Sequence, residues 1–326
     1  MSLWLIGAGT MAQDYAKVLQ SLGQDFQVIG RNAASAEKFQ SATGHPVRQG
    51  GLSSALAALG APQQAIVAVG VEQLADISTE LIKAGTRRIL LEKPGGLDTM
   101  QIRALQQMAA SHKADILIAY NRRFYASTAL ARKLIAEDGG ATSCTFEFTE
   151  WSHVIAPLTK GPGVKRAWFL ANSTHVVDLA FHLCGFPADW KGWHGGSLNW
   201  HPSAARFCGS GITEQGVFFS YQADWEAPGR WGVEVLTRKR RFIFRPMEQL
   251  QVLQLGSVKG DNLELDDALD NEFKPGLFMQ TKAFLDRDDY LFCSVDEQLR
   301  HCAVYDEMAG YKQIVSTAPL AKAALI

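Results

Sequence analysis

A glycine-rich turn near the N-terminus constrains the fold of this chain more than any other feature. The apolar run Leu3–Ile6 leads into Gly7-Ala8-Gly9-Thr10-Met11-Ala12, and apolar residues at helical spacing follow over residues 11–22. In such a strand–turn–helix unit the first glycine allows a tight turn, the second lets the backbone approach a pyrophosphate, and a small third residue lets helix and strand pack closely. The helix N-terminus offers free N–H groups to the phosphates. The turn therefore predicts a dinucleotide site, with a purely structural glycine turn as the weaker alternative. The expected contacts are Gly7, Gly9, Thr10, Met11 and Ala12.

Strands and helices alternate over the first 120 residues. Further strands are expected at residues 26–29, 65–69, 88–92 and 116–120, and helices at 34–42, 74–84 and 98–112. This rhythm is typical of a parallel sheet covered on both faces. We expect a doubly wound Rossmann domain over residues 1–122.

The rhythm changes in the second half of the chain. A helix at 127–137 and a strand at 142–149 precede a loop, and a helix over 174–184 ends at Gly185. Short aromatic-rich strands then run to about residue 255, and helical stretches follow at 278–285 and 295–316. We expect an α+β domain with a large, mostly antiparallel open sheet over residues 123–326, which binds substrate and forms an oligomer.

Composition excludes several functional classes. Lys and Arg number 32 against 33 Asp and Glu, so no basic surplus is available for a nucleic acid. The basic run 238–241 lies between two apolar runs and favours a hairpin turn over a binding patch. No apolar stretch reaches the roughly 18–20 residues of a membrane span, and the N-terminus lacks the pattern of a signal peptide. The five scattered cysteines form no CxxC pair, so we expect no disulfide frame, no metal site and a cytoplasmic location.

The end of the second predicted strand bears on the choice of dinucleotide. NAD-specific folds place a carboxylate there to hold the ribose hydroxyls, but this chain has Gly30-Arg31-Asn32. The Arg31 guanidinium would favour a 2′-phosphate, with Asn32 or Ser35 as further donors. The sequence therefore predicts NADP. NAD remains the alternative, with Arg31 stacked on adenine.

A lysine follows the strand at 88–92, at the edge where open α/β sheets bind ligands. Lys93, in the run Glu92-Lys93-Pro94, could donate to a substrate oxygen and place positive charge beside a nicotinamide. A lone lysine at a strand end is more often a surface residue. Its neighbours in the chain change that interpretation.

Four motifs in order resemble the Gfo/Idh/MocA family, which includes glucose–fructose oxidoreductase, inositol dehydrogenase and many sugar dehydrogenases. They are the glycine turn, Glu92-Lys93-Pro94-Gly95-Gly96, Tyr120-Asn121-Arg122-Arg123-Phe124, and His175-Val176-Val177-Asp178. The resemblance implies a Rossmann domain, a second domain with a large open sheet, and a sugar-like substrate between them. It also implies that Lys93 is catalytic and that His175 is the general acid/base. Gly70, Glu92, Lys93 and Asn121 join the predicted cofactor contacts.

The chemistry of hydride transfer agrees with the role of His175. Oxidation of an alcohol needs a base for the hydroxyl proton, and histidine suits this task. Asp178 and His182 share a helix face with His175, and Asp178 could orient it or a substrate hydroxyl. Helix capping by Asn172 or Ser173 is expected, and a position near the helix start tends to lower the pKa of His175. His182 has a different explanation, as a cation that suits the last turn of the helix.

One position departs from the family. Inositol-dehydrogenase-like members carry an Asp four residues before the catalytic His, where this chain has Ala171.

The loop that precedes the helix offers aromatic and charged side chains for a sugar or acidic sugar, although each of them alone is more often a packing or surface residue. The predicted substrate contacts are Arg122, Trp151, Arg166, Trp168, Asn172 and Asp178.

Together these observations predict an NAD(P)-dependent oxidoreductase, NADP favoured, that acts on the CH–OH group of a sugar or cyclitol derivative. One alternative keeps the fold but reduces a C=N or C=C bond. The other is a regulator that binds the nucleotide without turnover. An open sheet with exposed aromatic residues also predicts a homo-oligomer, a dimer in the simplest case.

Overall fold

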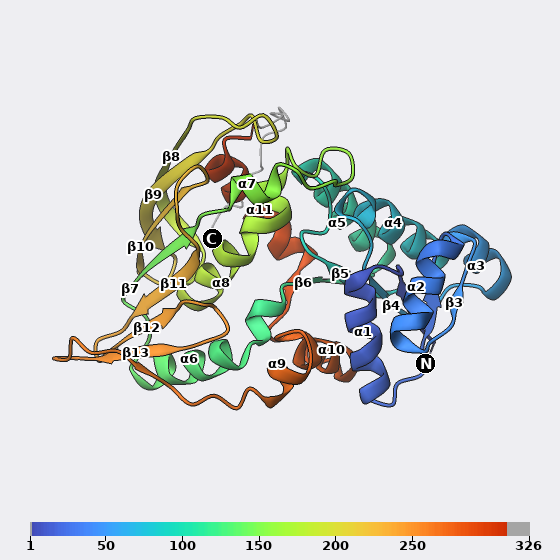
Figure 1. Cartoon of the computed structure of the whole chain (residues 1–326), viewed down its shortest axis with the longest axis horizontal. Helices are drawn as coiled ribbons and strands as arrows, with labels where there is room; N and C mark the ends of the chain where they lie inside the picture. Colours follow the sequence, from blue (N-terminus) through green and yellow to red (C-terminus); the bar gives the residue numbers. More distant parts are fainter. Residues whose placement is uncertain (1, 312–326) are drawn as a thin grey trace, which may run out of the picture.

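Two β-sheets organise residues 2–311, the part of the chain that the computed structural model describes (Figure 1). Sheet A has seven strands in the order β15-β6-β5-β4-β1-β2-β3. Its strands β1 to β6 are all parallel, and β15 is antiparallel to β6. The strands are β1 Leu3–Ile6, β2 Gln27–Ile29, β3 Val47–Arg48, β4 Gln64–Val67, β5 Arg88–Glu92, β6 Asp115–Ala119 and β15 Cys293–Ser294. The predicted Rossmann sheet is confirmed.

The connections between these strands are helical. They are α1 Thr10–Ser21, α2 Ala33–Thr43, α3 Gly51–Leu59, η1 Val71–Gln73, α4 Leu74–Ala84 and α5 Thr99–His112. Apolar side chains of the buried strands, such as Leu5 and Leu90, fill the core between sheet and helices. The sequence analysis missed β3 and α3. Gly50 and Gly51 both have positive φ angles, 97° and 78°, at the start of α3, so no ordinary cap marks where that helix begins.

Sheet B has eight strands in the order β14-β13-β12-β11-β7-β10-β9-β8. Neighbouring strands are antiparallel except β7 and β10, which are parallel. The strands are β7 Ser143–Phe148, β8 Pro187–Gly195, β9 Arg206–Thr213, β10 Phe218–Asp224, β11 Trp231–Leu236, β12 Arg240–Phe244, β13 Gln251–Gln254 and β14 Asp261–Asn262. The predicted large, mostly antiparallel sheet is confirmed. Strands β11 and β12 pair as a hairpin, so the basic run 238–241 forms its turn and the start of β12, as predicted.

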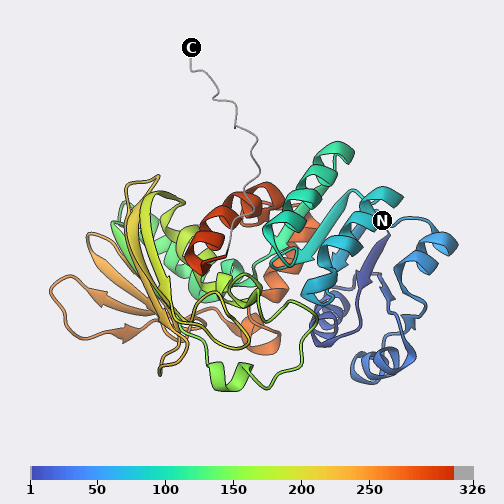
Figure 2. The same ribbon diagram turned by 90° about the horizontal axis from the view of Figure 1, so that it is seen from above.

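Helices of the second half lie between the sheets and along their edges (Figure 2). They are η2 Asn121–Phe124, α6 Ala126–Glu137, α7 Ser152–Ile155, the π-helical turn η3 Phe169–Ser173, α8 Thr174–Cys184, α9 Ala268–Glu272, α10 Leu277–Asp286 and α11 Val295–Ala309. Helix α8 packs against β7 and β11 and is buried from Thr174 to Phe181. Helix α11 ends at Ala309, before the predicted end at residue 316; residues 312–316 lie outside the described part.

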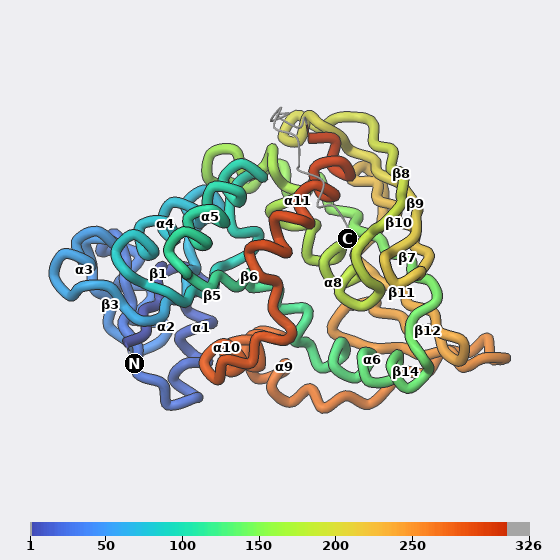
Figure 3. Tube along the Cα trace, turned by 180° about the vertical axis from the view of Figure 1, so that it is seen from behind, coloured from blue at the N-terminus to red at the C-terminus, as the bar shows by residue number. Residues whose placement is uncertain are grey.

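Several of the last elements of the described chain return to sheet A (Figure 3). Helix α10 packs against α1, helix α11 packs against α5, and β15 adds the last strand beside β6. Residues far from the N-terminus therefore complete the first sheet.

The division of the chain at residue 122 stays a prediction. Within residues 2–311, no helix has the length and apolar character that crossing a membrane requires.

A buried ion pair joins three of the elements between the sheets. Arg123 on η2 donates from Nη2 to Oδ1 of Asp178 on α8 at 2.6 Å and from Nε to Oδ2 at 2.9 Å. Its Nη2 also contacts Glu297 on α11 at 2.7 Å. The side chains of Arg123 and Asp178 are 3% and 0% exposed, so neither charge can turn to solvent.

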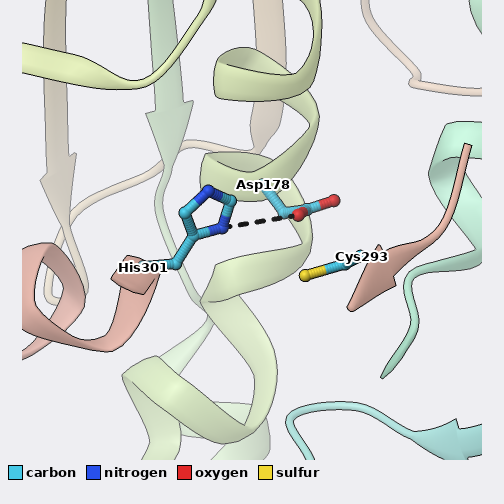
Figure 4. Close-up of side chains that lie close together, drawn as sticks. All are labelled: Asp178, Cys293 and His301. Carbon is cyan, nitrogen blue, oxygen red and sulfur yellow. Dashed lines mark ion pairs between the residues drawn. The ribbon is translucent and has the colours of Figure 1, made fainter. Parts of the chain in front are cut away.

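Cys293 and His301 lie beside Asp178 (Figure 4), with His301 Nδ1 at 4.0 Å from Asp178 Oδ1. Burial lowers the pKa of His301 to about 3, so the ring is neutral at physiological pH. The three side chains are of types that bind metals, but Arg123 already occupies both oxygens of Asp178. We therefore assign these three side chains to the buried cluster around the Arg123–Asp178 ion pair.

Replacing Asp178 with asparagine is expected to lower the free energy of unfolding by about 3–5 kcal/mol, because Arg123 would stay buried without its bidentate partner. Urea denaturation measures the change. The matched control is Asp286→Asn, which breaks the exposed pair with Lys282 on α10 and should cost less than about 1 kcal/mol. Equal losses in the two variants would contradict an organising role for the buried pair.

Candidate active site

The glycine turn has the geometry that a dinucleotide site requires. Gly7 has φ of 122°, and a Cβ there would lie 2.3 Å from the carbonyl oxygen of Ala68, so only glycine fits. Gly9 precedes α1, and a Cβ on it would meet no atom within 4 Å. Ala12, in the first turn of α1, is fully buried, and its small side chain permits close packing of the helix on the sheet. The open side of the turn is therefore free for a ligand.

A hollow of about 410 Å³ lies at this turn. It is lined at the carboxyl ends of β1, β2 and β4 by predicted cofactor residues, namely Gly7, Gly9, Thr10, Met11, Arg31, Asn32 and Gly70, together with Ser35. Asn32 also caps α2, because its Oδ1 accepts a hydrogen bond from the Ser35 backbone N–H at 3.0 Å. These residues therefore surround one space large enough for part of a dinucleotide.

Lys93 follows β5 at the same edge of sheet A. Its Nζ donates to the carbonyl oxygen of Ala171 at 2.5 Å, across to the turn that precedes α8. Burial lowers the pKa of Lys93 to about 8, while the charges of Glu92 and Glu150 oppose the shift. Glu92, in turn, accepts a hydrogen bond from Tyr15 at 2.9 Å, and burial raises its pKa. Lys93 is thus a cation that can lose its proton near neutral pH.

His175 lies in the first turn of α8, but the helix does not start freely there. The π-helical turn η3 leads directly into α8, and no side chain caps it. The expected capping by Asn172 or Ser173 is wrong, because both side chains donate to Glu150 Oε1 instead, at 2.9 Å and 2.8 Å. Burial, followed by the charges of Arg122 and Lys93, lowers the pKa of His175 well below its usual value. The expected neutral imidazole is present for this different reason.

Arg122 completes a cluster with Lys93 and His175. Its guanidinium lies 4.9 Å from the ring centroid of Trp231 and 5.8 Å from that of Tyr125. The rings of Trp231 and His175 are 6.1 Å apart. Arg122 from η2 and His175 from α8 therefore meet around Trp231 on β11. Lys93, which directly follows β5, is close enough for its charge to act on both.

The other predicted substrate residues divide into those that lie near the cluster and those that do not. Trp168 and Asn172 are near Glu150, and Trp151 packs under Arg230 at 4.7 Å. Two residues are not brought to the cluster. Arg166 is exposed, and its side chain forms no ion pair within residues 2–311. Asp178 is bonded to Arg123, so both carboxylate oxygens that were expected to orient His175 or a substrate hydroxyl are already engaged.

Two further residues, Asn121 and His182, lie in surroundings that the sequence did not indicate. Asn121 donates from Nδ2 to the carbonyl oxygen of Pro275 at 3.0 Å, which holds the loop before α10. Its contact with a cofactor stays a prediction. His182 is not a cation at the end of α8, because burial lowers its pKa well below the usual value. It lines a separate hollow of about 960 Å³ to which Lys93 and His175 do not contribute.

Sequence reasoning missed several members of the site. Glu150 is 3% exposed, and burial raises its pKa. It directly follows a predicted strand, so its position at a strand end was a signal that could have been used. Trp231 and Lys274 come from distant segments, and nothing in their local sequence marks them. Lys274 acts on the same groups, because its charge lowers the pKa of both Lys93 and His175.

Comparison with known proteins identifies the family of the first sheet. Residues 1–120 match the model of the Gfo/Idh/MocA family, an oxidoreductase family with an NAD-binding Rossmann fold. The match covers the residues of sheet A up to the end of β6. The resemblance inferred from the motifs is thereby confirmed, and the family is one of NAD-binding oxidoreductases. No curated protein matches the sequence.

Solved structures of this type share the fold over both sheets. UDP-N-acetylglucosamine 3-dehydrogenase from Acidithiobacillus ferrooxidans has 17% identity and a TM-score of 0.73, with 95% of this chain and 97% of that chain covered. Levoglucosan dehydrogenase in complex with NADH and L-sorbose has 16% identity and a TM-score of 0.77, with coverage of 95% and 96%. An Agrobacterium radiobacter oxidoreductase with NAD⁺, L-tartaric acid and magnesium has 13% identity, a TM-score of 0.73 and the same coverage. At these identities the likeness establishes the fold alone.

Proposed function

We propose that this protein is an NADP-dependent oxidoreductase that transfers a hydride between the nicotinamide and a CH–OH carbon of a sugar or cyclitol derivative. One observation carries the proposal. Lys93, bonded to the Ala171 carbonyl, shares a cluster with neutral His175 at the sheet edge that also bears the glycine turn. The strand ends of a parallel sheet place a nucleotide and a reacting group side by side.

The two side chains divide the proton chemistry between them. When bound, the nicotinamide supplies or accepts the hydride. His175 Nδ1 is buried and has no hydrogen-bond partner within the described chain, so it can accept the hydroxyl proton of an alcohol. The Lys93 ammonium stabilises negative charge that develops on the same oxygen. In the opposite direction the proton returns from His175 to the substrate oxygen, and the Lys93 ammonium again stabilises the negative charge on that oxygen.

Relatives in fold support the substrate class. Two of them are named as dehydrogenases of sugar compounds, levoglucosan and UDP-N-acetylglucosamine. The aromatic rings of Trp151, Trp168 and Trp231 around the cluster suit the apolar faces of a sugar ring. We therefore extend the same class of substrate to this chain.

His175→Gln and Lys93→Met are each expected to lower kcat by about 10²–10⁴-fold, because each removes a group that moves or stabilises the proton. Turnover of NADP⁺ with a panel of sugars and cyclitols, followed at 340 nm, measures the loss. His182→Gln is the matched control, since His182 is also a buried histidine of α8 but lies outside the cluster. Full turnover by His175→Gln would contradict its role as the base. No turnover of any sugar or cyclitol by the unchanged protein would favour reduction of a C=N or C=C bond instead.

The preference for NADP rests on Arg31. Arg31 lines the hollow at the glycine turn, and no carboxylate lines it to repel a 2′-phosphate. Arg31→Ala is expected to weaken NADPH binding by about 10-fold or more, the loss of a charge-assisted hydrogen bond. NADH binding should change little. Titration of nucleotide fluorescence measures both affinities, and equal loss for the two nucleotides would mean that Arg31 does not read the 2′-phosphate.

We also propose a homodimer formed through the open face of sheet B. Helices α8 and α11 lie between the two sheets, and the opposite face of sheet B points away from the rest of the described chain (Figures 1 and 2). Trp193 and Phe218, on β8 and β10, are 59% and 66% exposed. An apolar surface of this kind usually finds a partner.

The five cysteines are free thiols, which supports a location in the reducing cytoplasm.

A further inference from the structure

Arg122 lacks the partner that a largely buried arginine normally has. No carboxylate lies within 4.0 Å of its guanidinium in the part of the chain that the structure describes, and its Nε is buried with no hydrogen-bond partner. The next residue, Arg123, is bonded to both Asp178 and Glu297. The Arg122 side chain is only partly exposed, and a buried N–H group without a partner lowers stability. The two neighbouring arginines therefore differ in a way that a ligand for Arg122 would explain.

Two aromatic rings lie beside the Arg122 guanidinium. Its central carbon is 4.9 Å from the ring centroid of Trp231 and 5.8 Å from that of Tyr125. Such cation–π contacts do not use up the N–H donors of the group, whose fork geometry matches the two oxygens of a carboxylate. The arginine can therefore still bind a planar anion.

Two more polar atoms beside Arg122 are buried without partners. They are Nε1 of Trp231 and Nδ1 of His175, whose rings are 6.1 Å apart. Buried polar atoms in proteins are nearly always hydrogen-bonded. Three such atoms lie around one indole ring, so together they can form hydrogen bonds with the oxygen atoms of a single ligand.

The charges near the cluster are mostly positive. Lys93 and Lys274 both act on His175, and Arg230 lies 5.5 Å from the ring of Trp231. The acidic neighbours of Arg122 are Glu150 and Glu248, and both are farther than 4.0 Å from its guanidinium. Glu150 is already bonded to Asn172 and Ser173. Glu92 lies beside Lys93 and accepts a hydrogen bond from Tyr15. None of these carboxylates pairs with the Arg122 guanidinium, and this unpaired cation favours a negatively charged substrate over a neutral one.

We infer that the substrate is a sugar acid whose carboxylate binds the Arg122 guanidinium and the Trp231 indole N–H, while its reacting hydroxyl binds His175. This inference rests on the proposed function and adds the charge class of the substrate. The phosphates of the dinucleotide do not serve as this anion, because their place is the glycine turn, whose lining does not include Arg122. A bidentate pair with arginine is among the stronger hydrogen-bonded contacts in proteins.

Equilibrium binding to the protein saturated with NADPH tests the inference. The probes are matched acid and neutral sugars, namely glucuronate and glucose, galacturonate and galactose, and mannuronate and mannose, with glucose 6-phosphate as a second anion. At least one acid is expected to bind about tenfold or more tightly than its neutral partner. That preference should shrink as the salt concentration rises.

Two variants localise the effect. Arg122→Gln and Trp231→Phe should each reduce the preference for the acid over its neutral partner by about tenfold or more. Trp231→Phe keeps a ring beneath Arg122, so it separates the lost N–H from a packing defect. Arg132→Gln is the matched control, because Arg132 also stacks on an aromatic ring, Tyr290 at 5.4 Å, outside the cluster. Thermal unfolding verifies that each variant is folded.

The outcomes separate this inference from the proposed function. No saturable binding of any acid, equal binding of acid and neutral sugars, or an acid preference that survives Arg122→Gln would overturn the carboxylate site. Turnover of neutral sugars alone would do so while leaving the dehydrogenase intact. Tighter binding of glucose 6-phosphate would assign the anion to a phosphoester and also overturn the carboxylate. Acid binding that depends on Arg122, without oxidation of any probe, would support the site and count against the proposed reaction.

Discussion

The buried ion pair between Arg123 and Asp178 fixes the two elements on which the candidate site depends. Arg123 directly follows Arg122 on η2, and Asp178 lies one turn of α8 beyond His175. Because the pair is bidentate and shielded from water, the positions of η2 and α8 are coupled. Arg122 and His175 are therefore both held next to Trp231. The carboxylate that the motif suggested for chemistry instead supports the residues that touch the substrate in our proposal.

The Lys93 contact joins the two sheets in the same way. Lys93 extends from the end of β5, and its Nζ reaches the Ala171 carbonyl, four residues before His175. The position where related sequences carry an Asp thus contributes a backbone oxygen to the lysine. Glu150, from the end of β7, brings a carboxyl group near Lys93 from another direction. The site has an acidic group, although it does not come from the residue that the family motif indicated.

The sequence predicted the regular parts of this fold well because local patterns determine them. Strands β1 and β5 and helices α4 and α8 have the predicted bounds, since apolar runs and terminal glycines mark their ends. The glycine turn and Lys93 were found because parallel strands place their ends at one edge. Trp231, Lys274 and the ion pair of Asp178 depend on contacts between distant segments, which no local pattern encodes. Helix α3 was missed because two left-handed glycines replace an ordinary cap.

The central claim is that the glycine turn and Lys93 belong to one site, so that a bound nicotinamide covers the lysine. Acetylation of individual lysines by acetic anhydride, measured by mass spectrometry with and without NADPH, tests this directly and needs no knowledge of the substrate. We expect NADPH to slow the labelling of Lys93 while leaving the exposed Lys239, whose side chain is 65% accessible, unaffected. Saturating NADPH that leaves the labelling rate of Lys93 unchanged would contradict the claim.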